Sequence, residues 1–262
     1  MIVLKDIVII FLITIIALII FFIKKKKIKS FFSKKIESVN LDLVSPIFNL
    51  KKITNNLSGP NDDVIIKSFC INSNNKIVGM TSDYEAWIIS ALSKKSINIF
   101  EFGTCSGKTT YLMALNSPET SKIITLTLDP KKALSLNYQK EDNKVSFKNI
   151  INESIYEKFL FSGTNEEKKI KVIFKNSLEF DEKVYQNFFD LIFIDGGHTY
   201  SVVKNDSEKA FKMIKNNGII LWHDYVPGKE SAKNIVKYIN EISKIKKISH
   251  INNTSLCFYK KI

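Results

Sequence analysis

The stretch INIFEFGTCSG at Ile97–Gly107 joins a short apolar run to a loop with two glycines. Ile97–Phe102 has the length and hydrophobicity of a buried strand, and a helix is predicted to follow at Lys108–Leu115. Gly103 and Gly107 allow a tight turn and a close approach of the backbone to a ligand. The first N–H groups of the following helix can then face that ligand. This order predicts the ligand-binding end of a doubly wound α/β domain.

The same strand-and-helix pattern recurs along the chain. Alternating strands and helices predict a mostly parallel, seven-stranded Rossmann-like sheet with both faces covered. The other six strands are predicted at Ile123–Leu128, Lys171–Phe174, Asp190–Ile194, Gly218–Trp222, Lys247–Ile251 and Ser255–Tyr259. Further helices are predicted from the capping box at Ser82 to Lys95, at Tyr200–Lys215 and at Lys229–Ser243. Polar clusters end the first five strands, where ligands bind in such sheets.

A phosphate-binding P-loop is the first interpretation to test for the glycine loop. Gly107-Lys108-Thr109 resembles the end of such a loop, and Leu191–Asp195 resembles the strand that would accompany it. A P-loop needs four residues between its glycines, whereas three lie between Gly103 and Gly107. Phe102 also stands where the first glycine would be needed. A P-loop-like nucleotide hydrolase therefore remains only as an alternative.

Two acidic residues favour a different ligand. Glu101 precedes the loop and suits a ligand with an ammonium group and no pyrophosphate. Asp129 ends the next strand, at about the distance from Gly107 where a carboxylate binds ribose hydroxyls in dinucleotide folds. The pair predicts a nucleoside that carries a cationic tail.

The chain resembles the class I methyltransferases, which use S-adenosylmethionine as cofactor. The resemblance is to methyltransferase family 24 with the cephalosporin-hydroxylase-like and macrocin-type sugar O-methyltransferases, and more distantly to the cation-dependent catechol and caffeoyl-CoA type. It rests on GMTSDYEAWIISALSKKSINIFEFGTCSGKTT, TLDP, FDLIFIDGGHTY and GIILWHDY. It implies that Glu101, Gly103 and Gly107 contact the methionine moiety, Asp129 the ribose and Ser177 the adenine edge, with Met80, Thr81, Thr104 and Asp195 completing the cofactor site.

Asp195 and Asp224 end strands that should be adjacent, so their side chains are predicted to converge on the reacting centre. Methyl transfer needs an aligned acceptor and a group that removes its proton. His198 or His223 could be that base, or a divalent cation such as Mg²⁺ on Asp195 and Asp224 could lower the pKa of the hydroxyl. The cation-dependent relatives have an Asp-Asn pair where this chain has Asp224-Tyr225, which puts the metal in doubt. We expect O-methylation of a small-molecule, sugar or lipid-linked glycan hydroxyl.

The charge of the chain points to a membrane rather than to nucleic acid. The net charge is +13, yet all 39 basic residues are Lys, and Arg is the residue favoured for reading phosphates and bases. Ile7–Ile23 is apolar and about 26 Å long as a helix, and seven lysines lie between Lys24 and Lys35. By the positive-inside rule, a single-pass membrane protein with a cytoplasmic catalytic domain is expected.

The expected organisation is a membrane anchor at residues 1–29, a linker and cap at 30–78, and a methyltransferase domain at 79–262. A non-catalytic, membrane-attached scaffold with the same fold is the remaining alternative.

Overall fold

The computed structural model describes residues 11–22, 36–41, 47–48, 50–54, 57–60, 63–71, 76–77, 81–133, 150 and 153–262. The chain divides into two compact units, Met1–Lys35 and Ile36–Ile262. In the first unit, residues 11–22 form a helix. Within the described ranges, no helix has both the length and the apolar character needed to cross a membrane. The transmembrane helix predicted at Ile7–Ile23 is therefore not found, and residues 7–10 and 23 lie outside the described residues.

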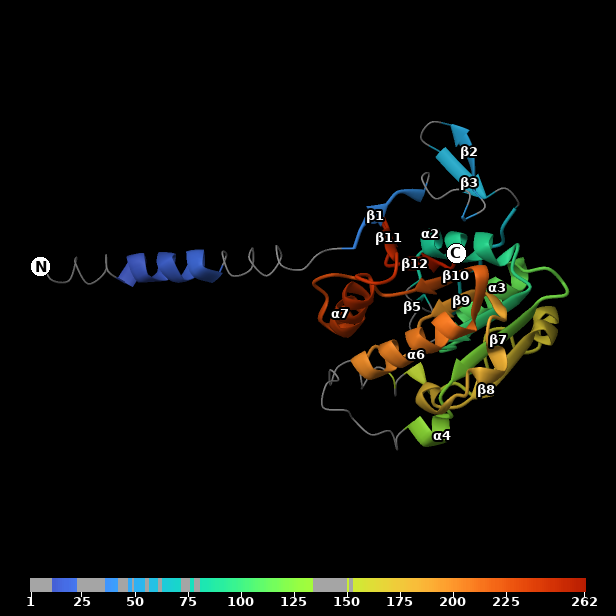
Figure 1. Ribbon diagram of the computed structural model, residues 1–262. Coiled ribbons are helices and arrows are strands. Elements are labelled where there is room, and N and C mark those ends of the chain that lie inside the picture. Colours follow the sequence, from blue (N-terminus) through green and yellow to red (C-terminus); the bar gives the residue numbers. More distant parts are fainter. Residues whose placement is uncertain are drawn as a thin grey trace, which may run out of the picture. The chain divides into compact units, whose positions relative to one another are not determined.

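The second unit is organised around an eight-stranded sheet with the order β1-β11-β12-β10-β9-β6-β7-β8 (Figure 1). Its strands are β1 (Ser38–Val39), β6 (Asn98–Phe102), β7 (Lys122–Thr127), β8 (Ile170–Phe174), β9 (Phe189–Ile194), β10 (Ile214–Trp222), β11 (Ser249–Ile251) and β12 (Cys257–Lys260). The helices are α2 (Asp83–Ser93), α3 (Lys108–Asn116), α4 (Pro130–Ala133), α6 (Tyr200–Met213) and α7 (Lys233–Ile242). Short 3-10 turns lie at Asn165–Lys169, Ser177–Glu179, Lys183–Tyr185 and Glu230–Ala232.

The mostly parallel, Rossmann-like sheet is confirmed, and the predicted count of seven strands is wrong by one. The seven predicted strands are present, and β12 alone runs antiparallel to its neighbours β10 and β11. The eighth strand, β1, pairs in parallel with β11 through Ser38 and Val39. Two residues are too few to show a strand period, so only the pairing reveals this strand.

Two other boundaries differ from the prediction. The helix expected to reach Lys215 ends at Met213, and β10 begins at Ile214 because that residue already pairs with Phe189. Ahead of α2, the described residues form two small hairpins, β2 (Leu50–Thr54) with β3 (Leu57–Pro60) and β4 (Cys70–Ile71) with β5 (Lys76–Ile77). The sequence predicted only a linker and cap in this stretch.

The side chains of the central strands alternate between two apolar layers. On β6, Phe100 and Phe102 pack in one cluster with α6 and α7, while Ile99 packs in the other with α2 and α3. On β9, Ile192 and Leu191 divide in the same way. Burial on both faces is what a parallel sheet requires, and it explains the near-continuous apolar runs.

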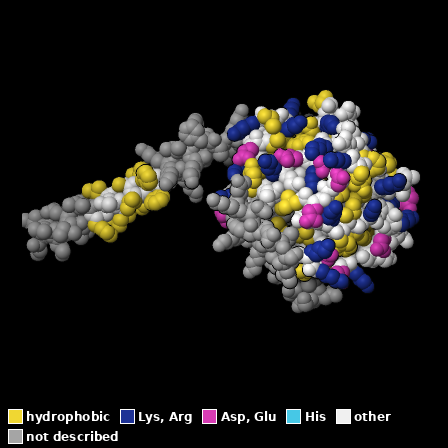
Figure 2. Space-filling view, turned by 60° about the horizontal axis from the view of Figure 1, so that its bottom comes forward, with side chains coloured by type: hydrophobic (Ala, Val, Ile, Leu, Met, Phe, Trp, Pro, Cys, Tyr) yellow, Lys and Arg dark blue, Asp and Glu magenta, His cyan; other side chains and the backbone are white. Residues whose placement is uncertain are grey.

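The strand order reverses between β6 and β9, which pair in parallel. From β6 the chain continues outward to β7 and β8 on one side, whereas β9 and β10 build the other side. The carboxyl ends of β6 and β9 thus form the switch point at which ligands bind in this class of fold. On the face of the molecule shown in Figure 2, lysines are interspersed with acidic and apolar side chains.

Candidate active site

The loop after β6 depends on its two glycines for steric reasons. Gly103 has φ +96°, and a Cβ at this position would lie 2.2 Å from the carbonyl oxygen of Asp195. Gly107 has φ +80°, and its Cβ would lie 2.7 Å from the ring of Phe161. The backbone of the loop therefore approaches the end of β9 more closely than any side chain would permit.

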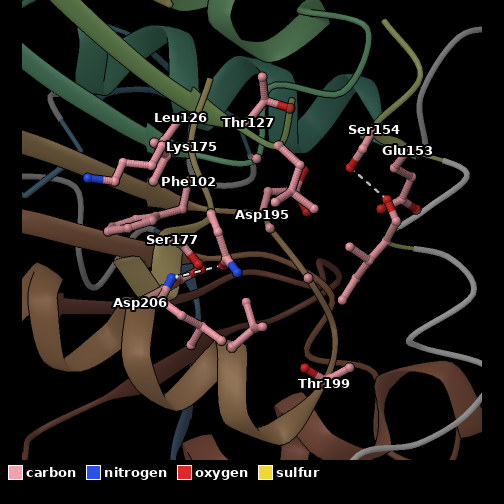
Figure 3. A pocket seen from close by; sticks show the side chains of 18 of the residues that line it. Phe102, Leu126, Thr127, Glu153, Ser154, Lys175, Ser177, Asp195, Thr199 and Asp206 are labelled. Atoms are coloured by element: carbon pink, nitrogen blue, oxygen red, sulfur yellow. Dashed lines mark hydrogen bonds between the residues drawn. The ribbon is translucent and has the colours of Figure 1, made fainter. Parts of the chain in front are cut away.

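A pocket opens beside this loop, over the carboxyl ends of the strands (Figure 3). It contains about 790 Å³ of space between the atoms, a volume that includes open solvent. Its walls combine apolar and polar side chains, among them Phe102, Leu126, Leu178, Ser177, Asp195 and Asp206. Glu153 and Ser154 lie on the side opposite Ser177 in Figure 3.

The predicted cofactor residues divide into two groups around this pocket. Gly103, Ser177 and Asp195 line it directly. Thr81, Glu101, Thr104 and Gly107 are buried and are not among the residues that line it. Asp129 follows the lining residue Leu128 and is half-buried, with Oδ1 accepting a hydrogen bond from the Lys131 N–H at 3.0 Å. Met80 lies outside the described residues.

Glu101 is fully buried on β6. Its Oε2 accepts hydrogen bonds from the hydroxyls of Thr110 and of Thr125, the latter at 2.6 Å, while its buried Oε1 has no hydrogen-bond partner among the described residues. Burial raises the pKa of this carboxyl to about 8. An acceptor of this kind fits the ammonium group of a cationic ligand, which would restore the ionised form.

The predicted cluster after β9 and β10 is assembled in the structure. Because Trp222 pairs with Ile194, the residues that follow the two strands leave the sheet together. His198 Nε2 lies 3.1 Å from Asp224 Oδ2. His223 Nδ1 lies 3.0 Å from Asp195 Oδ1 and 3.4 Å from Asp224 Oδ2.

The two histidines have different electrostatic surroundings. Burial lowers the pKa of His223, but the three carboxylates of Asp195, Asp224 and Glu85 outweigh it and raise that pKa well above the usual value. For His198, burial is likewise outweighed, mainly by the hydrogen bond to Asp224, so its pKa is also raised. Among the described residues, neither His223 Nε2 nor the buried Nδ1 of His198 has a hydrogen-bond partner, but His223 Nε2 lies 3.6 Å from Glu85 Oε2 and so has a carboxylate near it.

Glu85 is a member of this cluster that sequence reasoning missed. It was visible only as the capping-box residue of α2, where its Oε2 accepts hydrogen bonds from the N–H and hydroxyl of Ser82. The same oxygen lies 3.6 Å from His223 Nε2, and Oε1 accepts from the N–H and hydroxyl of Ser255, at 2.6 and 2.7 Å. Ser255 Oγ in turn accepts from the Asp224 N–H at 3.3 Å. The sequence pattern indicated that Glu85 caps the helix, but it did not indicate the contacts of Glu85 with His223 and Ser255.

Asp195, His198 and Asp224 could in principle share a cation, because one ligand atom from each lies within 4.8 Å of the others. Asp195 Oδ1 already contacts the imidazole of His223, and Asp224 Oδ2 contacts the imidazoles of both His198 and His223. Mg²⁺ prefers a shell of oxygens in near-ideal octahedral geometry. Two oxygens and one nitrogen that are already partnered do not fit a resident Mg²⁺.

The position of Lys108 argues against the P-loop interpretation. Its side chain is buried, and its ammonium donates to the Thr81 carbonyl at 3.2 Å. A P-loop lysine must instead reach the phosphates of a nucleotide.

Residues 100–225 match the family model of a methyltransferase domain. No curated protein matches the sequence. In structure the chain is similar to a protein assigned as a caffeoyl-CoA O-methyltransferase from Staphylococcus aureus, with a TM-score of 0.50 and 18% identity over 71% of this chain and 86% of that one.

Two further similar structures contain S-adenosylhomocysteine. One is the O-methyltransferase from Bacillus cereus, with a TM-score of 0.47 and 16% identity over 70% of this chain and 82% of that one. The other is a methyltransferase from Podospora anserina, with a TM-score of 0.49 and 16% identity over 70% and 79%. The methyltransferase-domain match over residues 100–225, together with the strand order and the glycine loop, identifies the chain as a class I S-adenosylmethionine-dependent methyltransferase.

Proposed function

We propose that the enzyme methylates a hydroxyl oxygen of a small-molecule, sugar or glycan acceptor. The observation that carries this proposal is the double placement of Asp195. Its side chain lines the pocket, and its Oδ1 contacts the ring of His223. Asp195 therefore connects the pocket with a group that can accept or donate a proton, the imidazole of His223.

The chain's own residues fit S-adenosylmethionine. When bound, the cofactor supplies an electrophilic methyl group on its sulfonium. Glu101 offers to the ammonium group a buried oxygen that has no hydrogen-bond partner among the described residues, and the absence of a Cβ at Gly103 lets the glycine loop pack against the Asp195 backbone. Asp129 and Ser177 follow β7 and β8 at the same edge of the sheet, which suits the nucleoside end.

His198 is the residue best placed to take the proton of the acceptor hydroxyl. Asp224 faces Nε2, so it favours the tautomer in which Nε2 carries the hydrogen and Nδ1 keeps its lone pair. The same carboxylate would stabilise the imidazolium that forms when Nδ1 accepts a proton. His223 has carboxylates at both nitrogens, so its role is to balance charge rather than to act as the base.

The class of acceptor and the location are proposed from the family resemblance and from the N-terminal sequence. The family resemblance supports a sugar or lipid-linked glycan. The apolar run at Ile7–Ile23 and the lysines after it support attachment to the cytoplasmic face of a membrane. Turnover of soluble phenols without turnover of any glycan would remove the sugar proposal. Recovery of the full chain in the soluble fraction of cells would remove the membrane proposal.

The test of the proposed function is calorimetric titration of S-adenosylmethionine and S-adenosylhomocysteine into the full chain in detergent micelles. We expect micromolar binding that Asp129→Ala weakens at least tenfold. Asp181→Ala is a matched control, because Asp181 Oδ1 accepts from the N–H two residues later just as Asp129 Oδ1 does, at 3.1 and 3.0 Å. Absence of binding of either ligand, or equal losses in the two variants, would contradict the proposal.

A further inference from the structure

Asp206 is a buried carboxylate in the wall of the pocket that the proposed mechanism does not use. It lies on α6 and has only 1% of its surface exposed, yet it lines the pocket beside Ser177. Figure 3 shows Asp206 and Ser177 on the same side of the pocket. The position is separate from the cluster of His198 and Asp224.

The surroundings hold this carboxylate and the loop after β8 in one place. Asn205 Nδ2 donates to Asp206 Oδ1 at 2.8 Å and to the Ser177 carbonyl at 3.0 Å. Lys209 Nζ donates to the carbonyls of Ser177 and Phe180, at 2.5 and 2.6 Å. The ammonium of Lys209 is thus committed to backbone oxygens.

The described residues give Asp206 two hydrogen bonds, fewer than its carboxylate can accept. An ionised carboxylate offers about four acceptor positions and no donor. Asn205 occupies one, and the Ser177 side chain supplies a second hydrogen bond. Burial raises the pKa of Asp206 to about 6, so it is mainly ionised at pH 7.5. Burying a charge with open acceptor positions is costly unless a ligand provides donors.

The walls around Asp206 define the kind of donor. Phe102, Leu126, Leu178 and Val202 are apolar and line the same pocket, which suits a flat aromatic base. A carboxylate at the edge of such a base can only accept hydrogen bonds, so it is complementary to an exocyclic amino group on the base, which donates them. A carbonyl oxygen at that position would face a carboxylate oxygen, with no hydrogen between them.

We propose that Asp206 accepts a hydrogen bond from the exocyclic amino group of the cofactor's adenine and makes the pocket selective for a 6-amino over a 6-oxo purine. This inference rests on the proposed binding of S-adenosylmethionine in the pocket. It adds a specificity-determining residue on α6 to the glycine loop and the strand ends.

The experiment compares three ligands by calorimetry at pH 7.5 with the full chain in detergent. These are S-adenosylhomocysteine, its deaminated 6-oxo analogue S-inosylhomocysteine, and the analogue with hydrogen at position 6. We expect the wild type to prefer the 6-amino to the 6-oxo ligand by roughly 10- to 100-fold, with the 6-hydrogen ligand between them. In Asp206→Asn, which has nearly the same shape but can also donate, the preference should fall at least tenfold.

Glu208→Gln is the matched control, because Glu208 lies on the same helix, is exposed, and forms an ion pair with Lys204, at 4.0 Å. Its selectivity should equal that of the wild type. Equal weakening of all three ligands in Asp206→Asn would show a purely structural role and overturn the inference. So would an unchanged ratio in a folded Asp206→Asn variant. If that variant does not fold, equal wild-type affinity for the 6-amino and 6-oxo ligands overturns it. Absence of binding of all three ligands to the wild type contradicts the proposed function itself, and this inference falls with it.

Discussion

His198 Nε2 lies 3.1 Å from Asp224 Oδ2, and the other ring nitrogen of His198 is buried without a hydrogen-bond partner among the described residues. One nitrogen is thus oriented by a carboxylate while the other is free to accept a proton. We therefore expect His198→Gln to lower kcat by about 100-fold or more, the usual effect of losing a general base. The dissociation constant of S-adenosylhomocysteine should change less than twofold. His250→Gln is the control, because His250 lies on β11 and contacts Ser38 and Thr254. Equal kcat values for the two variants would exclude His198 as the base.

The rate of methyl transfer should rise with pH through the pKa of His198, because only the neutral ring can accept a proton. The hydrogen bond to Asp224 outweighs burial and raises that pKa, so the inflection should lie above 6.5. Asp224→Asn removes the negative charge and should move the inflection to lower pH. The measurement is kcat against pH for both proteins. An inflection that stays in place would show that another group titrates.

Glu101 should make the ligand-free protein less stable as the pH rises. Its pKa is about 8 in the folded protein and 4.5 in the unfolded chain, so the folded state binds more protons between these values. Stability therefore falls as the pH rises from about 4.5 to about 8. Glu101→Gln removes this dependence, and its Tm relative to the wild type should be higher at pH 8 than at pH 5.

Glu119→Gln is the control for that experiment. The exposed carboxylate of Glu119 forms a salt bridge that lowers its pKa. The pH range in which its titration changes the stability of the protein therefore lies below 4.5. Thermal unfolding of all three proteins across this pH range decides the matter. An equal Tm difference between Glu101→Gln and the wild type at both pH values would contradict the buried, protonated state of Glu101.

Gly103→Ala should destabilise the protein much more than Gly163→Ala. Both glycines have positive φ, at +96° and +78°, so both variants incur a backbone strain of about 1–2 kcal/mol. A Cβ at Gly103 would also overlap the Asp195 backbone, whereas nothing lies within 4 Å of one at Gly163. This overlap adds about 1–3 kcal/mol. Free energies of unfolding in urea provide the comparison, and similar values for the two variants would refute the close approach.

Methyl transfer should survive a chelator. His223 Nδ1 already contacts both carboxylates that a cation would need, at 3.0 and 3.4 Å. We expect turnover with excess EDTA to match turnover with Mg²⁺. Loss of activity in EDTA that Mg²⁺ or Mn²⁺ restores would show that a cation displaces the imidazole contacts.

The sequence by itself determined the architecture of the sheet and the edge where the site lies. The apolar runs of β6, β7, β9 and β10 are long enough to show their period, and polar residues follow each of them. Right-handed parallel crossovers then place those residues at one edge. The loop glycines also followed from the sequence, because glycine has no Cβ and so permits positive φ and a close backbone approach.

Only the tertiary structure decided how the groups at that edge are partnered. Glu85 reads locally as a helix cap, yet its carboxylate joins Ser255 and His223 because α2 packs beside the ends of β10 and β12. In the sequence, Asp206 is only one of several polar residues in a predicted helix, whereas in the structure it lies in the wall of the pocket. Hydrogen bonds between residues far apart in the chain depend on ångström-scale packing of whole elements. The local periodicity of the sequence shows which face of a helix or strand is buried. Which side chains from different elements contact one another is determined only when those elements pack together.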